Sequence, residues 1–290
     1  MGNPSPDIVT VCATCFGVSI GVRCRSVDQK AVSSHLPLNS ERVSSLAAEH
    51  VFSLEPHSED ETLFSIRRGS SLRASRQPLN SALKTLQKQL HICIAEHATS
   101  HAFVHAGVLA WKNRAVIFPG FSHAGKSTLV WSLVQAGAVY YSDEYAVFDE
   151  SGYVCPFALP ISLRLNHGER AIIMPDRTGS SPLQADLIVF TRYRPGAVWR
   201  PRPLGPAETM LQLIRHSIAI RRNPSLVLPV LKKISLQTRS QSFLGRRGDS
   251  LQLLQWLAGG SKRGDLCYTS DTGITDRSNE EVIKNDGKSS

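Results

Sequence analysis

The sequence lacks several features that would define whole classes of protein. No apolar run approaches the ~20 residues that a membrane-spanning helix needs, so we expect no such helix. No basic segment precedes the first apolar stretch, so we expect no secretory signal, and Pro6 stands where a myristoylation motif starting at Gly2 has Ser or Thr. The C-x-x-C at Cys12 and Cys15 has no second cysteine pair to complete a zinc site. We therefore expect the six cysteines to be reduced thiols of a cytoplasmic protein.

Long basic runs are also missing, although the net charge is +9. The arginines form short pairs, at Arg67-Arg68, Arg221-Arg222 and Arg246-Arg247, without an accompanying aromatic–basic module. This pattern argues against a nucleic-acid-binding protein. An acidic partner, such as a nucleotide or an acidic peptide, accounts for the excess of positive charge, and so does a solvated basic surface.

The 290 residues present allow one or two domains with a sizeable core. Residues 1–77 are rich in predicted strands: one or two in 8–24, and a pair formed by AEHVFSLEP and ETLFSIRRG around the polar HSED. An amphipathic helix follows Pro78, with Asn80 or Ser81 as its expected cap. The apolar stripe of this helix consists of Leu79, Leu83, Leu86, Leu90 and Ile94.

The middle of the chain predicts a strand, a loop, a helix and a second strand over 114–142. GVLAWKNRAVIFP predicts a hairpin that turns at Lys112-Asn113. STLVWSLVQ predicts a helix that Gly137 ends, and AVYYSDEYAVF predicts one strand, followed by the turn DESG and a strand in YVCPF. This is the β-α-β context in which a phosphate-binding loop occurs.

Such a loop is present between that strand and helix, because GFSHAGKS fits the pattern G-x-x-x-x-G-K-[ST]. Gly120 and Gly125 allow the backbone to approach phosphates, Lys126 is expected to reach the β- and γ-phosphates, and Ser127 is expected to ligate Mg²⁺. The alternative is a glycine-rich turn with no ligand. The predicted nucleotide-binding residues of this stretch are Gly120, Ser122, His123, Ala124, Gly125, Lys126, Ser127 and Thr128.

An acidic pair follows the second strand of this unit. A right-handed β-α-β unit makes its two strands parallel, so their carboxyl ends share one edge of the sheet. We therefore expect Asp143 to lie beside the phosphate loop, and Ser127 with Asp143 or Glu144 to hold Mg²⁺. The alternative is that Asp143 only holds Mg²⁺ through water, as in a P-loop ATPase.

The hairpin register places a histidine at the same edge. If Trp111 pairs with Arg114, then counting outward pairs His105 with Gly120, at the mouth of the loop. His105 is then expected to orient Asp143 or the acceptor. A zinc site formed by His97, His101 and His105 at spacings of four is the competing interpretation.

The remaining sequence predicts a strand at 186–191 and a helix that starts at Pro206. Another helix is expected to start near Pro229, and Asp249 is expected to cap the last one. The tail 260–290 is polar and has no aliphatic periodicity, so we expect it to be disordered.

The order and spacing of HAGVLAW, PGFSHAGKSTL, YYSDEYAVFD and PISLRL resemble the HPr kinase/phosphorylase superfamily, and within it the stand-alone branch of HPr-kinase-related proteins. The resemblance runs from about His97 to Trp256. It implies an α/β fold with a P-loop kinase core of the type shared with phosphoenolpyruvate carboxykinase, preceded by a β-rich region. It also implies that Asp143 is the general base that deprotonates an acceptor serine. The implied divisions are 1–97, 98–259 and the tail 260–290.

Three positions depart from the family pattern. Thr128 stands where those kinases usually have Glu, and Glu144 stands where they usually have Asp. PISLRL supplies Arg164, expected to contact the nucleotide, but lacks the neighbouring acid of the stretch tied to phosphorylase activity. We therefore expect forward transfer only, to an acceptor other than HPr.

Together these features predict a cytoplasmic kinase that uses ATP and Mg²⁺ to phosphorylate a Ser or Thr hydroxyl of a small protein or peptide, with an acidic one favoured by the charge. Asp143 and His105 are its expected catalytic residues. The alternatives are a nucleotide-binding regulator or ATPase without a protein acceptor, and a small-molecule kinase. Neither nucleic acid nor a membrane is an expected partner, and a homo-oligomer remains open.

Overall fold

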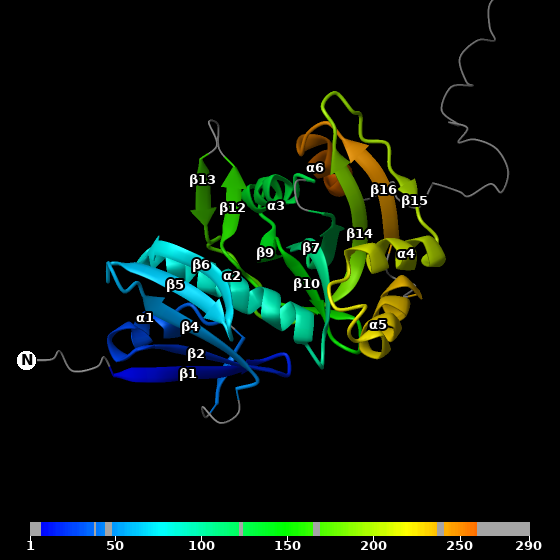
Figure 1. Ribbon diagram of the computed structural model, residues 1–290. Coiled ribbons are helices and arrows are strands. Elements are labelled where there is room, and N and C mark those ends of the chain that lie inside the picture. Colours follow the sequence, from blue (N-terminus) through cyan, green and yellow to red (C-terminus); the bar gives the residue numbers. More distant parts are fainter. Residues whose placement is uncertain are drawn as a thin grey trace, which may run out of the picture. The chain divides into compact units, whose positions relative to one another are not determined.

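A computed structural model shows a mixed α/β protein with several sheets (Figure 1). The chain divides into two compact units, Met1–Leu254 and Gln255–Ser290, and the description below concerns the first. No helix among the described residues is long and apolar enough to cross a bilayer. The predicted disordered tail, 260–290, lies outside the described residues, as do Ser122 and His123 of the loop. The structure describes residues 7–37, 39–43, 48–121, 124–164, 169–236 and 241–259.

A six-stranded sheet forms from the N-terminal part of the chain, as the strand-rich sequence predicts. Its first two strands form a hairpin whose turn residues, Phe16 and Gly17, both have positive φ. The predicted pair around HSED is confirmed as two antiparallel strands. In the order in which they lie in the sheet, the strands are β3 (Glu41–Arg42), β1 (Ile8–Cys15), β2 (Val18–Arg25), β4 (His50–Pro56), β5 (Leu63–Arg68) and β6 (Ser71–Pro78).

Helix α2 (Leu79–His97) packs against this sheet through its predicted apolar stripe. Leu83, Leu86 and Ile94 are each at most 2% exposed. The predicted cap by Asn80 or Ser81 is wrong: the N-cap residue is Pro78, and no side-chain cap is formed there among the described residues. Strand β6 runs directly into Pro78, so the helix starts before either polar residue can occupy the capping position. Two short helical turns, η1 (Ser26–Asp28) and α1 (Gln29–Ser33), precede it in the chain.

The second sheet carries the central part of the chain and contains both parallel and antiparallel pairs. A separate two-stranded hairpin of β12 (Ile161–Arg164) and β13 (Arg170–Ile173) contributes the PISLRL stretch. The strands of the second sheet are β7 (Ala102–Trp111), β8 (Arg114–Pro119), β9 (Val139–Ser142), β10 (Tyr145–Phe148), β11 (Tyr153–Cys155), β14 (Leu183–Tyr193), β15 (Arg202–Pro203) and β16 (Gln241–Arg247).

The predicted hairpin of β7 and β8 is confirmed in its register as well as its turn. Lys112 and Asn113 have φ of 51° and 60°, the left-handed pair that a two-residue type I′ turn requires. Trp111 pairs with Arg114. At the far end the Gly120 N–H donates to the carbonyl of His105 at 3.1 Å, so the counted pairing holds along the whole hairpin.

The single strand predicted for 138–148 is wrong, because the acidic pair interrupts it and divides it into β9 and β10. The hydroxyl oxygen of Ser142 accepts hydrogen bonds from the backbone N–H groups of Glu144, at 3.3 Å, and Tyr145, at 3.1 Å. This local turn competes with strand pairing, as serine hydroxyls often do. Because of this break, Asp143 and Glu144 belong to neither strand and lie between β9 and β10.

Both β8 and β9 pair antiparallel with β7, so they run parallel to each other with β7 between them. Strand β14 runs parallel to β8, and β16 runs parallel to β14. The carboxyl ends of all four strands therefore lie at one edge of the sheet. This edge receives the phosphate loop after β8 and the acidic pair after β9.

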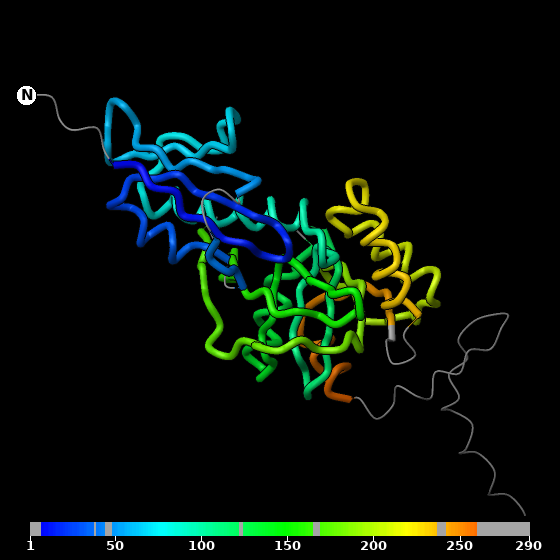
Figure 2. Tube along the Cα trace, turned by 90° about the horizontal axis from the view of Figure 1, so that it is seen from below, coloured from blue at the N-terminus to red at the C-terminus, as the bar shows by residue number. Residues whose placement is uncertain are grey.

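Helices cover the sheet on both faces. Helix α3 (Lys126–Gln135) contacts β7 and β9 and has Gly137, with φ of 99°, just past its end, as predicted. Helices α4 (Pro206–His216) and α5 (Pro224–Leu236) lie side by side and share a core with Val104, Ala106 and Val108 of β7 (Figures 1 and 2). Alternation along the strand then directs His105 and Gly107 to the α3 face.

The start of α4 at Pro206 is confirmed, but the predicted helix start near Pro229 is wrong. Helix α5 begins at Pro224, because the side-chain oxygen of Asn223 accepts the Leu226 N–H at 3.3 Å and caps the helix there. Pro229 lies inside the helix. The predicted cap by Asp249 is confirmed: its carboxylate accepts the Gln252 N–H at 3.0 Å, at the start of α6 (Leu251–Ala258).

Candidate functional site

The loop GFSHAGKS leaves the sheet where the buried strand β8 ends, and helix α3 starts at its lysine. Gly125 has φ of +76°, in the left-handed region that favours glycine, and a Cβ there would lie 2.8 Å from an Arg247 nitrogen. Among the described residues, no side chain caps the N-terminus of α3. Its first backbone N–H groups therefore remain available to an anion.

Lys126 is buried, and its ammonium group contacts the loop and the opposite strand. Its Nζ donates to the carbonyl oxygens of Gly120 at 2.8 Å and Phe121 at 3.1 Å. The same Nζ lies 3.4 Å from Nε2 of His105. Burial lowers the pKa of Lys126, while the charges of Glu144 and Asp143 oppose this effect. The lysine thus lies between the loop carbonyls and the acidic pair.

Asp143 is the most deeply buried acid of the site, at 3% exposed. Its Oδ1 accepts a hydrogen bond from the Tyr140 hydroxyl at 3.2 Å, and the Ser127 side chain lies near enough to the carboxylate to lower its pKa. Burial raises the pKa of Asp143 to about 6, the nearby Glu144 adds to this, and the side chains of Ser127, Tyr140 and Lys126 oppose it. Such a carboxylate is a base whose strength matches neutral pH.

Glu144 faces His105 rather than the loop hydroxyl. Its Oε2 lies 3.3 Å from Nε2 of His105, and its side chain is half exposed. The hydrogen bond from His105 lowers the pKa of Glu144, and burial partly opposes this. The Ala106 N–H donates to the backbone carbonyl of Glu144 at 3.1 Å, which fixes the acidic pair against β7. The predicted proximity of His105 to the loop is confirmed, but its direct partners are Glu144 and Lys126, not Asp143.

Gly107 explains how closely helix α3 approaches β7. A Cβ at this position would lie 2.5 Å from Cγ2 of Val130, a residue of α3 that is fully buried. The next nearest atoms are the Ser142 carbonyl oxygen and the Asp143 Cα, at 3.9 and 4.0 Å. The absence of a side chain at position 107 therefore lets the helix, the loop and the acidic pair meet.

Arg247 is a site residue that the sequence did not single out. It ends β16, is 2% exposed, and its Nη2 donates to the carbonyl of Gly125 at 2.7 Å and lies 3.4 Å from that of Ala124. Its guanidinium lies over the Tyr193 ring, 5.8 Å from the centroid, and its Nε has no hydrogen-bond partner within the described part of the chain. Burial lowers its pKa. Arg246-Arg247 was visible only as one of several arginine pairs, because strand β16 and its parallel pairing were not predicted.

Other predicted residues lie further from this cluster. Thr128 is exposed in the first turn of α3, and Arg164 is exposed at the end of β12, opposite Arg170. Strand β12 contacts α3, which places Arg164 on an element adjoining the helix of the loop. Ser122 and His123 lie outside the described residues.

The histidines His97, His101 and His105 do not form the helical zinc site that their spacing allows. His97 ends α2, whereas His105 is within β7. His101 lies between the two elements, and its ring packs against Phe16 with 4.5 Å between centroids. The three side chains therefore have no common helix face.

The donor set suits a nucleotide phosphate with Mg²⁺. A serine hydroxyl and a carboxylate, the hard oxygen ligands that Mg²⁺ prefers, lie near each other at Ser127 and Asp143. Lys126, the start of α3 and the buried Arg247 supply positive charge on the side of the loop. No protein-family model matches the chain, and no curated protein matches it.

Proposed function

We propose that the protein is an ATP-dependent kinase that transfers the γ-phosphate to a Ser or Thr hydroxyl of a small protein or peptide, on a P-loop core of the HPr kinase type. One observation carries the proposal: Lys126, Ser127 and a buried Asp143 lie near one another at a single sheet edge, next to a helix start that no described side chain caps. Phosphoryl transfer depends mainly on positioning and on electrostatic stabilisation, and these groups supply both.

Each residue has a distinct role in this proposal. The loop amides and Lys126 hold the phosphates, and Gly125, with φ of +76°, gives the loop its turn at the start of the helix. Ser127 and Asp143 hold Mg²⁺, which when bound neutralises charge on the phosphate oxygens. Asp143 also accepts the proton of the acceptor hydroxyl, a task for which the raised pKa of the metal-free carboxyl suits it near neutral pH.

His105 and Glu144 form a hydrogen-bonded pair beside the lysine in this scheme. With Nε2 protonated, His105 donates to Glu144, and this orients the carboxylate toward the lysine side of the site. Glu144 then has an electrostatic role, since its carboxylate partly offsets the desolvation of the Lys126 ammonium group. Arg164 is assigned to nucleotide contact in the same proposal.

The acceptor is proposed to be acidic, because the chain has a net charge of +9. Electrostatic attraction raises the association rate of oppositely charged partners, and salt weakens it. A reducing compartment fits the five described cysteines, which are free thiols, so the cytoplasm is the proposed location.

The direct test follows the fate of labelled γ-phosphate. Purified protein is incubated with Mg²⁺ and γ-labelled ATP, with and without a panel of acidic and basic peptides that contain Ser or Thr. The kinase proposal predicts label on a peptide hydroxyl, more on acidic than on basic peptides, and less as salt increases. Label found only in inorganic phosphate with every acceptor indicates an ATPase instead, and label on a small metabolite indicates a small-molecule kinase.

A further inference from the structure

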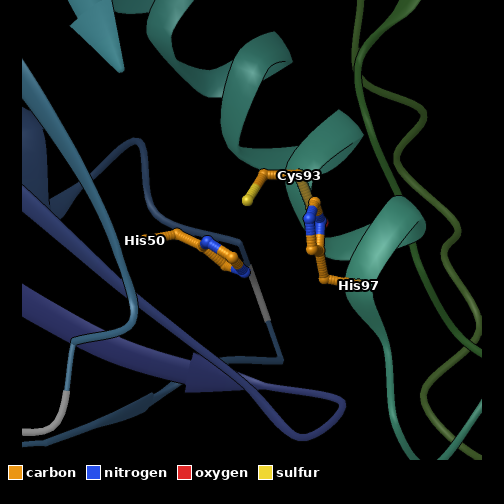
Figure 3. Close-up of side chains that lie close together, drawn as sticks. All are labelled: His50, Cys93 and His97. Carbon is orange, nitrogen blue, oxygen red and sulfur yellow. The ribbon is translucent and has the colours of Figure 1, made fainter. Parts of the chain in front are cut away.

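Three side chains of metal-ligating type converge away from the phosphate loop, between the N-terminal sheet and helix α2. They are His50, the first residue of β4, and Cys93 and His97 of α2 (Figure 3). The ligating atoms of the three all lie within 4.8 Å of one another. In Figure 3 the side chains extend from the strand and the helix toward the space between them.

The positions of Cys93 and His97 follow from helix geometry. Residues four apart lie on the same face of a helix, one turn from each other. Cys93 is fully buried, while His97 lies at the partly exposed end of α2. His50 approaches from a different element, where β4 pairs with β2. A ligand held by all three would join the sheet to the helix.

The hydrogen bonding of His97 prepares its outer nitrogen for a ligand. Nδ1 of His97 lies 2.9 Å from the carbonyl oxygen of Cys93, so Nδ1 carries the proton and donates it to that oxygen. Nε2 is then unprotonated and carries the lone pair that a metal would use. Metal-ligating histidines commonly donate their other ring N–H to a backbone carbonyl in this way, which fixes both the tautomer and the ring orientation.

We propose that His50, Cys93 and His97 form a binding site for a divalent transition metal ion of the Zn²⁺ type, with a fourth position open to water or an anion. One thiolate and two imidazoles are a ligand set that favours zinc over the harder Mg²⁺ or Ca²⁺. Ligating atoms of a tetrahedral zinc site lie roughly 3.3–3.8 Å apart, given bonds of about 2.0–2.3 Å. The cluster therefore closes by about 1 Å on binding, a movement within reach of side-chain torsions.

Two arginines oppose metal binding in the free protein and define the test. Nη1 of Arg222 lies 2.8 Å from Nε2 of His97, and Nη2 of Arg68 lies 3.4 Å from ring nitrogens of both histidines. Arg222 occupies the lone pair that the metal needs, so it must move aside. Its exposed side chain can do so, whereas Arg68 is held by Glu96 at 3.8 Å and by the Phe52 ring. Arg222 thus acts as a competitor of the metal, and its removal is expected to raise metal affinity.

The experiment titrates the full-length protein with Co²⁺, a spectroscopic substitute for Zn²⁺, and then displaces it with Zn²⁺ alone. Wild type is expected to bind one equivalent with a thiolate-to-metal charge-transfer band. His97→Ala is expected to weaken metal binding at least ~100-fold, because the loss of a ligand costs more than the loss of a residue that only hydrogen-bonds a ligand. Cys93→Ser is expected to abolish the charge-transfer band, whereas Cys155→Ser and Cys267→Ser keep it.

Arg222→Gln gives the complementary result, because it keeps every proposed ligand and removes the competitor nearest to His97. We expect it to bind Zn²⁺ at least about tenfold more tightly than wild type, which corresponds to one hydrogen bond to a charged donor. The proposal is overturned if Cys93→Ser keeps the band or if Arg222→Gln leaves the affinity unchanged. It is also overturned if sulfate or inorganic phosphate, and not Zn²⁺, stabilises the protein in a way that Arg222→Gln removes, since the cluster would then be an anion site.

Discussion

The buried hydroxyl of Tyr140 donates to Oδ1 of Asp143 at 3.2 Å and to the carbonyl of Leu159 at 2.7 Å. A phenol between two acceptors shares its proton, so the carboxylate receives less than a full hydrogen bond from it. The pKa of Tyr140 is raised well above its ordinary value, first by burial and then by the Asp143 charge, so the phenol remains a donor. Asp143 is therefore held in place by a neutral group.

Asp143→Asn should separate nucleotide binding from transfer. The change keeps the size of the side chain and removes the base. General-base contributions are typically ~10²–10⁴-fold in rate, so we expect transfer to fall by at least ~10² while ATP affinity stays within about tenfold. Calorimetric titration with Mg-ATP and a transfer assay on the same preparation measure both. Equal losses of affinity and rate would make Asp143 chiefly a metal ligand.

The raised pKa of Asp143 predicts the pH dependence of both activity and stability. Because kcat/KM reports the free enzyme, its acidic limb should fall tenfold per pH unit below an apparent pKa of about 6. In the unfolded chain the same carboxyl has a pKa of about 3.9. Between about pH 4 and pH 6 it is therefore ionised in the unfolded chain and still mostly protonated in the folded one. The nucleotide-free wild type then loses up to about 3 kcal/mol of folding free energy as the pH rises through this window.

Asp143→Asn lacks this ionisable group and provides the control. Urea denaturation at pH 5 and pH 8, without nucleotide or metal, should show the stability difference growing in favour of the variant at the higher pH. A difference that is the same at both pH values would mean that the buried carboxyl does not titrate in this window.

Gly107→Ala should disturb the site through helix α3. The new methyl group would meet Cγ2 of Val130, so the helix must move or the side chain must rotate. Overpacking of this kind costs typically about 1–3 kcal/mol of stability, and here it should also weaken ATP binding, because the loop is continuous with α3. Thermal unfolding and nucleotide titration measure the two effects.

The double variant Gly107→Ala/Val130→Ala removes the colliding methyl group and should recover most of the lost ATP affinity. If the double variant binds ATP no better than Gly107→Ala, the steric explanation for the glycine is wrong.

Arg247→Ala should weaken ATP binding by about ten- to hundredfold, because the loop carbonyls at Ala124 and Gly125 lose their charged donor. Arg246→Ala is the matched control: its side chain is the exposed neighbour on the same strand and should leave binding unchanged. If the two substitutions have equal effects, Arg247 contributes only through the overall charge and not through its contacts with the loop.

The sequence predicted local geometry well wherever one short pattern determines it. The turn at Lys112-Asn113 and alternation along the hairpin were sufficient to place His105 opposite Gly120. The apolar stripe of α2 and the turn residue Gly137 were equally local. These features depend on periodicity and on residue types that favour a positive φ, and both can be read directly from a sequence.

Contacts between distant segments could not be predicted from the sequence. The break at Asp143-Glu144 depends on one serine hydroxyl competing with strand pairing, within a stretch of otherwise uniform strand character. Arg247 reaches the loop only because β16 joins the sheet beside β14. The cluster of His50, Cys93 and His97 likewise combines residues more than 40 positions apart, a relation that spacing along the chain does not reveal.

The proposed kinase activity depends above all on whether the loop holds a nucleotide. Thermal unfolding is measured for wild type, Lys126→Ala and the control Lys112→Ala, whose exposed lysine lies at the hairpin turn, each with and without Mg-ATP. Ligand at 100 times its dissociation constant stabilises a protein by about 2.7 kcal/mol. We expect this stabilisation for wild type and Lys112→Ala and its loss in Lys126→Ala. A Lys126→Ala protein that keeps the full wild-type shift would contradict this expectation.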